Sequence, residues 1–264
     1  MDYPFPHQTK ETLKRFGMLP YQSNLVPSPE QIQQLREALV EDAQSYLYNG
    51  IVSFGAAVQS IGAKNYGWAI VKLYYSVFYL ARAKLAIGQQ VALVYDGRKP
   101  YLLSLSSGDI LQPQNNKSDK SNTHKLTLHL LSKHFLSNSL ANSSISKDNT
   151  PVLEWLKKQR EQANYNSARM PDPEPPEILK KIVEIGNINK WLETYKQDSI
   201  YVTDEEHVCL AYPFLLLIDI LEDFQNQSVD CNILRDNLDF IESLLTEDKN
   251  KSLDALLSDI RKCL

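Results

Sequence analysis

Arg160, in the segment WLKKQREQANYN (155–166), is the side chain around which chemistry can be assembled in this sequence. Its planar guanidinium can donate two parallel hydrogen bonds to a phosphate or a carboxylate. Lys157 precedes it by three residues, and Asn164 and Tyr165 follow it four and five residues later. We expect neighbouring helices to bury the back of this segment and to leave Arg160 accessible. A solvated charge or a structural ion pair is the alternative.

A second set of candidate side chains lies on the strongest predicted helix, residues 68–88, which reads WAIVKLYYSVFYLARAKLAIG. Its apolar residues recur at helical spacing. Lys72, Tyr75, Tyr79 and Arg82 form a separate polar and aromatic stripe, and we predict that this stripe binds substrate. Tyrosines at this spacing often line a core or an interface instead, so a structural role for the stripe stays open.

Three histidines lie on another predicted helix, THKLTLHLLSKHF (123–135). His124, His129 and His134 are five residues apart, so successive rings rotate by about 140° around the helix axis and do not share a face. We therefore predict no metal site on this helix. Histidine exchanges protons near neutral pH, and His124, at the start of the helix, is the candidate for that role in a cleft shared with Arg160.

The composition is that of an ordinary globular protein. Of the 264 residues, 43% are hydrophobic and 23% are charged, and only 9 are glycine, which favours a mainly helical fold. The longest apolar run, 208–218, is too short for a membrane span. The start MDYPFPHQTK has no signal-peptide pattern, and the three cysteines have no metal-type spacing. We predict a cytoplasmic protein with thiols in a reducing compartment.

Charge is distributed unevenly along the chain. Residues 1–170 carry 19 Lys and Arg against 12 Asp and Glu, a net +7, whereas residues 171–264 carry 9 against 20, a net −11. A basic front suits an anionic ligand, and the acidic rear suits an exposed helical surface. Common signatures of nucleotide-binding loops, serine hydrolases and zinc proteases are absent, so we predict no cofactor.

Local patterns place the remaining elements. Five prolines predict an irregular arm over 1–29, with one helical turn near 11–16. The sequence SPEQ (28–31) predicts the start of a helix, and an Asp-Gly turn between apolar runs predicts a β-hairpin at about 91–105. We expect QPQNNKSDKSN (112–122) to be a polar linker. The predicted helices cover 29–59, 68–88, 123–135, 150–167, 178–195, 204–226, 230–246 and 252–263.

Three segments in order resemble motifs of the HEPN superfamily. The segment YYSVFYLARA (74–83) is similar to the family's early helix, SNTHKLTLHLLSKHF (121–135) resembles its Ser-His-Lys helix, and REQANY (160–165) resembles its arginine helix. The resemblance covers roughly residues 30–200. It implies a helical bundle of HEPN type with one inserted hairpin, preceded by the arm at 1–29 and followed by a helical extension at 201–264.

The resemblance also implies function. HEPN proteins are usually dimeric and often act on RNA in toxin–antitoxin and antiviral systems, so RNA, a second copy of the chain and a partner protein from the same operon are the expected partners. The family reaction needs no metal: a ribose 2′-hydroxyl attacks its own phosphate while an arginine stabilises the charge and a histidine moves the proton. Arg160 would hold the phosphate, and Asn164 and Tyr165 would position it.

The chain departs from the catalytic pattern at one position. Catalytic HEPN members carry a histidine four to six residues after the arginine, whereas residues 164–166 here read Asn-Tyr-Asn. Tyr165 is a poor substitute, because a phenol loses its proton near pH ~10. His124 is the candidate for the missing imidazole. This departure leaves three hypotheses: a ribonuclease, a non-catalytic HEPN module that binds RNA or docks a partner through its acidic helices, and a helical adapter.

Overall fold

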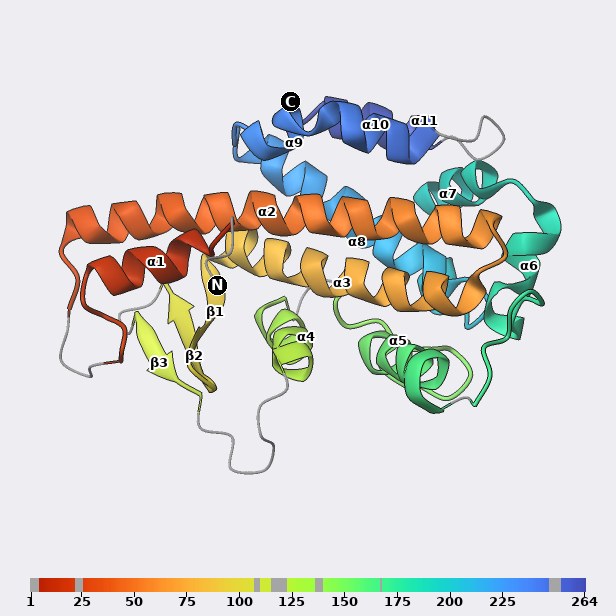
Figure 1. The fold of residues 1–264 in the computed structure, drawn as a ribbon, viewed down its shortest axis with the longest axis horizontal. Coiled ribbons are helices and arrows are strands. Elements are labelled where there is room, and N and C mark those ends of the chain that lie inside the picture. The colour runs from red at the N-terminus through yellow and green to blue at the C-terminus, as the bar shows by residue number, and fades with distance from the viewer. Residues whose placement is uncertain are drawn as a thin grey trace. The chain divides into compact units, whose positions relative to one another are not determined.

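The structure is a computed structural model that describes residues 5–21, 26–106, 110–114, 123–135, 140–166, 168–246 and 253–264. As the sequence predicts, α-helices dominate, and a small antiparallel sheet accompanies them (Figure 1). The chain divides into two compact units. Unit 1 comprises Met1–Tyr46 and Ala81–His134, and unit 2 comprises Leu47–Leu80 and Phe135–Leu264. The domain boundaries predicted after residues 29 and 200 stay a prediction.

Two long helices, α2 (Pro29–Gly62) and α3 (Tyr66–Gln89), contribute to both units. The predicted start of α2 is confirmed, because Ser28 and Gln31 exchange reciprocal side-chain to backbone hydrogen bonds of 2.8 and 3.2 Å. Gly50 does not break α2. A Cβ there would lie 2.6 Å from Leu80 Cδ2, and the Gly50 carbonyl accepts a hydrogen bond from Ser76 Oγ at 2.9 Å. Glycine therefore lets α3 approach α2 closely.

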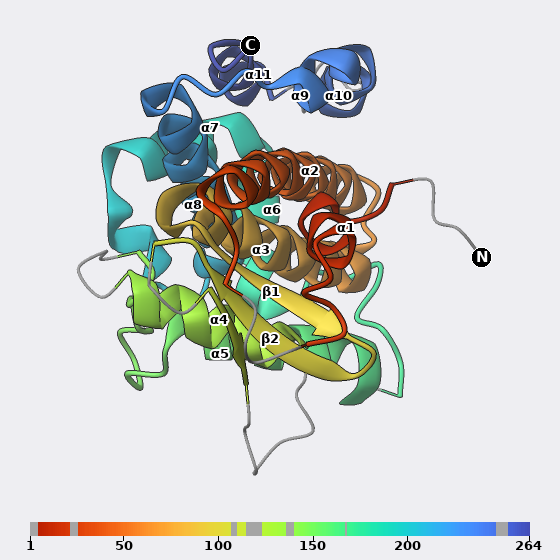
Figure 2. The same ribbon diagram turned by 90° about the vertical axis from the view of Figure 1, so that its left-hand side faces the viewer.

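Unit 1 adds helices and a three-stranded sheet to its parts of α2 and α3. These elements are α1 (Gln8–Arg15), β1 (Val91–Asp96), β2 (Lys99–Ser104), β3 (Leu111–Pro113) and α4 (Thr123–His134). The helix α1 is two turns long rather than the single turn that was predicted, and it lies beside α2 (Figure 2). Its Leu13 is fully buried, so the arm is partly an ordered, packed segment.

The predicted hairpin is confirmed, with its turn shifted by one residue. Asp96 pairs with Lys99, so the two turn residues are Gly97 and Arg98. Gly97 has a φ of 58°, which the first turn position of a type II′ hairpin requires. The predicted linker begins too early, because Gln112 and Pro113 belong to β3 and pair with β2. Pro113 lies on this edge strand, the usual place for proline in a sheet.

Unit 2 is helical. Its elements are α5 (Val152–Glu161), η1 (Gln162–Asn166), α6 (Glu177–Ile185), α7 (Ile188–Gln197), η2 (Ser199–Val202), α8 (Val208–Asn226), α9 (Asn232–Asp236), α10 (Leu238–Thr246) and α11 (Asp254–Arg261). The single helix predicted over 178–195 is wrong. Gly186 ends α6 in the left-handed conformation with a φ of 69°, and the Asn187 side chain caps α7. A second break separates α9 from α10.

The core of unit 2 forms around α8, most of whose side chains are buried. Phe214 of α8 faces Phe54 of α2, with ring centroids 6.1 Å apart. The helix α10 packs against α2 from another side, where a Cβ on Gly55 would lie 2.9 Å from side-chain atoms of Leu244 and Leu245. Among the described residues, each helix is too short or too polar to cross a lipid bilayer.

Candidate functional site

The helix α5 places Arg160 at its carboxyl end. Val152, Leu153, Trp155 and Leu156 form the apolar face of α5 and are buried, and the same packing encloses Arg160. Only 8% of its surface is exposed. The expectation that the chain leaves Arg160 accessible is therefore wrong, because the apolar stripe of α5 continues through this position.

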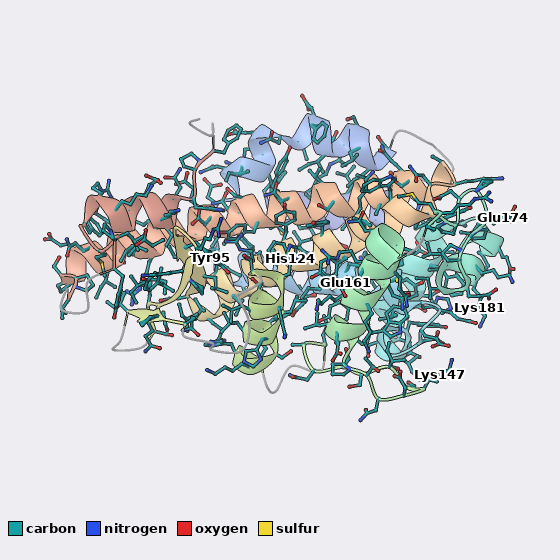
Figure 3. The ribbon with its side chains drawn as sticks, turned by 60° about the horizontal axis from the view of Figure 1, so that its bottom comes forward. Tyr95, His124, Lys147, Glu161, Glu174 and Lys181 are labelled. Atoms are coloured by element: carbon teal, nitrogen blue, oxygen red, sulfur yellow. The ribbon has the colours of Figure 1, made fainter. Side chains whose placement is uncertain are left out.

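The guanidinium of Arg160 lies close to a tyrosine ring and to a carboxylate. Its Cζ lies 4.9 Å from the centroid of the Tyr74 ring on α3, a cation–π arrangement. Its Nη2 lies 3.4 Å from Glu161 Oε1. Glu161 is the last residue of α5 (Figure 3). The same Glu161 oxygen lies 3.6 Å from Lys157 Nζ. Lys157 and Arg160 thus share one carboxylate, which offsets part of the positive charge available to an anionic ligand.

Tyr74 of α3 is not among the site residues predicted from the sequence. The ring is buried, and burial raises the pKa of its hydroxyl to about 12, although the positive charge of Arg160 opposes that rise. Tyr74 is therefore neutral at physiological pH and presents its ring to Arg160. A desolvated cation–π contact contributes about 2 kcal/mol. Sequence patterns give no signal for this pairing, because Tyr74 and Arg160 are 86 residues apart in the chain.

The predicted stripe on α3 is only partly available to a ligand. Tyr75 and Tyr79 are half-buried, with ring centroids 6.4 Å apart, and Tyr75 also touches Tyr74 edge-on. Lys72 is also half-buried, and its Nζ donates to Ser60 Oγ at 2.9 Å and to the Ala56 carbonyl at 3.3 Å, both on α2. The structure thus connects Arg160 to the two tyrosines through Tyr74, and it ties Lys72 to α2.

A π-helical turn, η1, follows α5 directly and carries Asn164, which is half-buried. Such turns are rare and occur often at functional sites, because they displace side chains from the regular helical register. The side chain of Tyr165 lies outside the described residues, so its predicted role in positioning a phosphate stays a prediction.

Asp172 fixes the segment that follows the π-helical turn, and sequence reasoning missed it. Its Oδ1 accepts hydrogen bonds from the backbone amides of Tyr66 and Gly67, the first residues of α3. A carboxylate at this position satisfies amides that have no partner within the helix and complements the helix dipole. A Cβ on Gly67 would lie 3.2 Å from Asp172 Oδ2, so glycine gives the carboxylate room. Arg160 before the turn and Asp172 after it thus both contact α3.

The two remaining candidates, His124 and Arg82, belong to unit 1. His124 is half-buried in the first turn of α4. Arg82 of α3 donates from Nη2 to the Tyr46 hydroxyl at 2.6 Å, and its Cζ lies 4.1 Å from the centroid of that ring. The predicted role of His124 as a proton shuttle for Arg160 stays a prediction.

Within the described part of the chain, no three His, Cys, Asp or Glu side chains are grouped so that they could hold a metal ion. All three cysteines are free and buried. Burial raises the pKa of the Cys231 thiol to about 12, so at neutral pH it is protonated and a poor nucleophile.

Comparison of the chain with protein-family models, with curated proteins and with solved structures found no match in any of the three. Neither the HEPN resemblance nor a particular activity is therefore supported from outside the chain. The structure itself shows a buried arginine in contact with a tyrosine ring and a carboxylate, next to a π-helical turn.

Proposed function

We propose that this chain is a non-catalytic helical module of the HEPN type that docks a partner protein through the acidic helices of unit 2. The observation that carries the proposal is the burial of Arg160. A phosphate clamp must present its guanidinium to the ligand, but this one is 8% exposed and shares the Glu161 carboxylate with Lys157. An RNA phosphate would have to displace that carboxylate and enter a packed contact with Tyr74.

The docking role is supported by a pattern that recurs three times in unit 2. Ile185, Ile200 and Phe240 are 48%, 63% and 49% exposed. An exposed carboxylate precedes each of them by one or two residues: Glu184, Asp198 and Asp239. Residues 171–264 together carry a net charge of −11. Such surfaces repel nucleic acid and attract a protein whose binding face combines basic and apolar side chains.

The test combines an RNA assay with a binding assay on the full chain. We expect no cleavage of mixed RNA in the presence of EDTA. A protein captured from the source cells should be lost when Asp236→Lys, Asp239→Lys and Phe240→Ser are combined. It should be retained by the matched charge change Glu30→Lys with Glu37→Lys, at exposed positions of α2 in unit 1. Equal capture by both variants contradicts the docking role.

A ribonuclease is the second candidate, and the π-helical turn after Arg160 favours it. In that case RNA binding releases Arg160 from Glu161, and Tyr75 and Tyr79 stack on bases. Metal-independent cleavage by the wild type, lost in both Arg160→Ala and Tyr165→Phe, would establish this function and overturn the first. Loss in Arg160→Ala counts only if the variant keeps its helical circular-dichroism spectrum, because the residue is buried.

A further inference from the structure

Four polar side chains of unit 1 form a connected group that the proposed function does not use. They are His7, Asp42, Tyr46 and Arg82, called the His7 cluster below. His7 immediately precedes α1, Asp42 and Tyr46 lie one turn apart on α2, and Arg82 lies on α3. Asp42 and Tyr46 are 3% and 4% exposed, whereas the His7 side chain is 53% exposed. The His7 cluster thus combines two buried side chains with an imidazole that is exposed to solvent.

The hydrogen bonds of the cluster accommodate a neutral His7. A guanidinium only donates, so the 2.6 Å contact between Arg82 Nη2 and the Tyr46 hydroxyl makes the phenol oxygen the acceptor. The hydrogen of that hydroxyl can then be donated to His7 Nδ1, which lies 3.2 Å away. A ring nitrogen that accepts carries no proton, so in this arrangement His7 is neutral, with its hydrogen on Nε2.

Asp42 connects this chain of bonds to the start of α1. Its Oδ1 accepts from the Gln8 amide at 2.8 Å, and its Oδ2 accepts from the Thr9 amide at 3.1 Å. These bonds satisfy the first amides of α1, which have no partner within the helix. His7 Nδ1 lies 3.9 Å from the same Asp42 Oδ1. If His7 took up a proton, its Nδ1 would donate a hydrogen bond instead of accepting one from Tyr46. It would then compete with the Gln8 amide for Asp42 Oδ1.

The charges that face His7 come from three helices: Lys10 on α1, Asp42 on α2 beside the neutral Tyr46, and Arg82 on α3. Burial lowers the pKa of His7 from its ordinary 6.5, and Arg82 and Lys10 lower it further, while Asp42 raises it; the net direction is down. The docked arrangement therefore favours the neutral ring for electrostatic reasons as well as for hydrogen bonding.

We propose that the His7 cluster is a pH-sensitive latch, which holds α1 against α2 while His7 is neutral and releases α1 when His7 takes up a proton. Since the pKa of His7 is lower when α1 is docked, its contribution is fully present above about pH 6.5. The contribution weakens as the pH falls from there through the docked-state pKa. Release would uncover the face of α2 that carries Asp42 and Tyr46.

Amide hydrogen exchange on the full chain tests the latch. We compare protection factors, which correct for the intrinsic effect of pH on exchange, for α1 at pH 7.5 and pH 5.0. Wild-type α1 should lose about fivefold in protection at the lower pH, the size expected for one neutral hydrogen bond. In His7→Gln the amide oxygen can still accept from Tyr46 but cannot be protonated, so the protection of α1 should be equal at both values.

Two further measurements test whether the pH dependence of α1 comes from His7 itself. His129→Gln changes an exposed histidine of α4 and should behave as the wild type does. An NMR titration should give a midpoint for the His7 ring that coincides with the midpoint of α1 opening. The proposal is overturned if His7→Gln keeps the wild-type pH dependence, or if the two midpoints differ. If α1 of His7→Gln is already unprotected at pH 7.5, the comparison of the two midpoints in the wild-type protein still tests the proposal.

Discussion

Each unit contains an arginine stacked on a tyrosine, and the two pairs use their polar atoms differently. In unit 1, Arg82 lies 4.1 Å from the Tyr46 ring centroid and also donates to the Tyr46 hydroxyl. That hydroxyl is hydrogen-bonded in turn to His7, whose ring is exposed to solvent. In unit 2, Arg160 lies 4.9 Å from the Tyr74 ring centroid, is nearly sealed, and has Glu161 as its nearby carboxylate.

This difference shows why residue type and helical spacing do not by themselves identify a binding site. Both arginines were selected as ligand contacts from the sequence, yet each has a tyrosine partner on another helix. The two arginines differ in exposure. Arg82 is half-buried and remains in contact with solvent, whereas Arg160 is almost fully buried and mainly contributes to packing between helices. The comparison predicts unequal effects when either pair is broken.

The largest expected effect is that of Arg160→Ala. Removing a long buried side chain leaves a cavity and takes away the cation over Tyr74, so we expect a loss of about 2–4 kcal/mol in the free energy of unfolding. Tryptophan fluorescence during urea unfolding measures it, since Trp68, Trp155 and Trp191 all belong to unit 2. Arg169→Ala, at an exposed position, is the control, and equal losses in both variants would show that Arg160 is not a packing residue.

A smaller effect is expected for Arg82→Ala, about 1–2 kcal/mol, since Arg82 is half-buried and the substitution removes its charged hydrogen bond to Tyr46 together with the contact to that ring. Unit 1 contains no tryptophan, so circular dichroism during urea unfolding is the suitable measurement. Arg98→Ala at the exposed hairpin turn is the matched control. A loss as large as that of Arg160→Ala would contradict the distinction drawn from exposure.

Much of the fold could be predicted because local patterns determine it. The capping pair Ser28 and Gln31, the glycine of the hairpin turn and the apolar stripes act over a few residues, and each was placed within one or two positions. The split between α6 and α7 was missed although Gly186 is present, because an isolated glycine inside a helical pattern is often tolerated. The left-handed φ of Gly186, which ends α6, is visible only in the folded structure.

The candidate site was harder to predict, because its geometry depends on contacts between distant segments. The selection of Arg160 as a site residue stays a prediction, and its exposure depends on packing against Tyr74, which is indistinguishable in sequence from other apolar residues of α3. Asp172 and Asp42 were missed for the same reason. Each carboxylate caps a helix to which it does not belong, and no spacing rule connects such a residue to the amides that it binds.

Alkaline pH offers a third, intermediate test of the pair in unit 2. Burial raises the pKa of Tyr74 to about 12 from an ordinary 10.0, so its stabilising contribution is complete below pH 10 and is lost as the pH rises through 12. One such group changes the unfolding free energy by up to about 1.4 kcal/mol per pH unit. Tyr74→Phe should therefore show a shallower loss of stability between pH 10 and 12 than the wild type, and an identical slope would contradict this assignment.

The smallest expected effect, that of Glu161→Gln, decides which group holds Arg160 in place. The Glu161 side chain is 35% exposed, and solvent screening keeps its attraction for Arg160 and Lys157 weak, so we expect a loss of at most about 1 kcal/mol. Urea unfolding at low and high salt, followed by tryptophan fluorescence, measures it. If the loss instead approaches that of Arg160→Ala, the carboxylate rather than the Tyr74 ring fixes the guanidinium. An anion that replaces Glu161 could then compete for Arg160, and the case for a phosphate site would be strengthened.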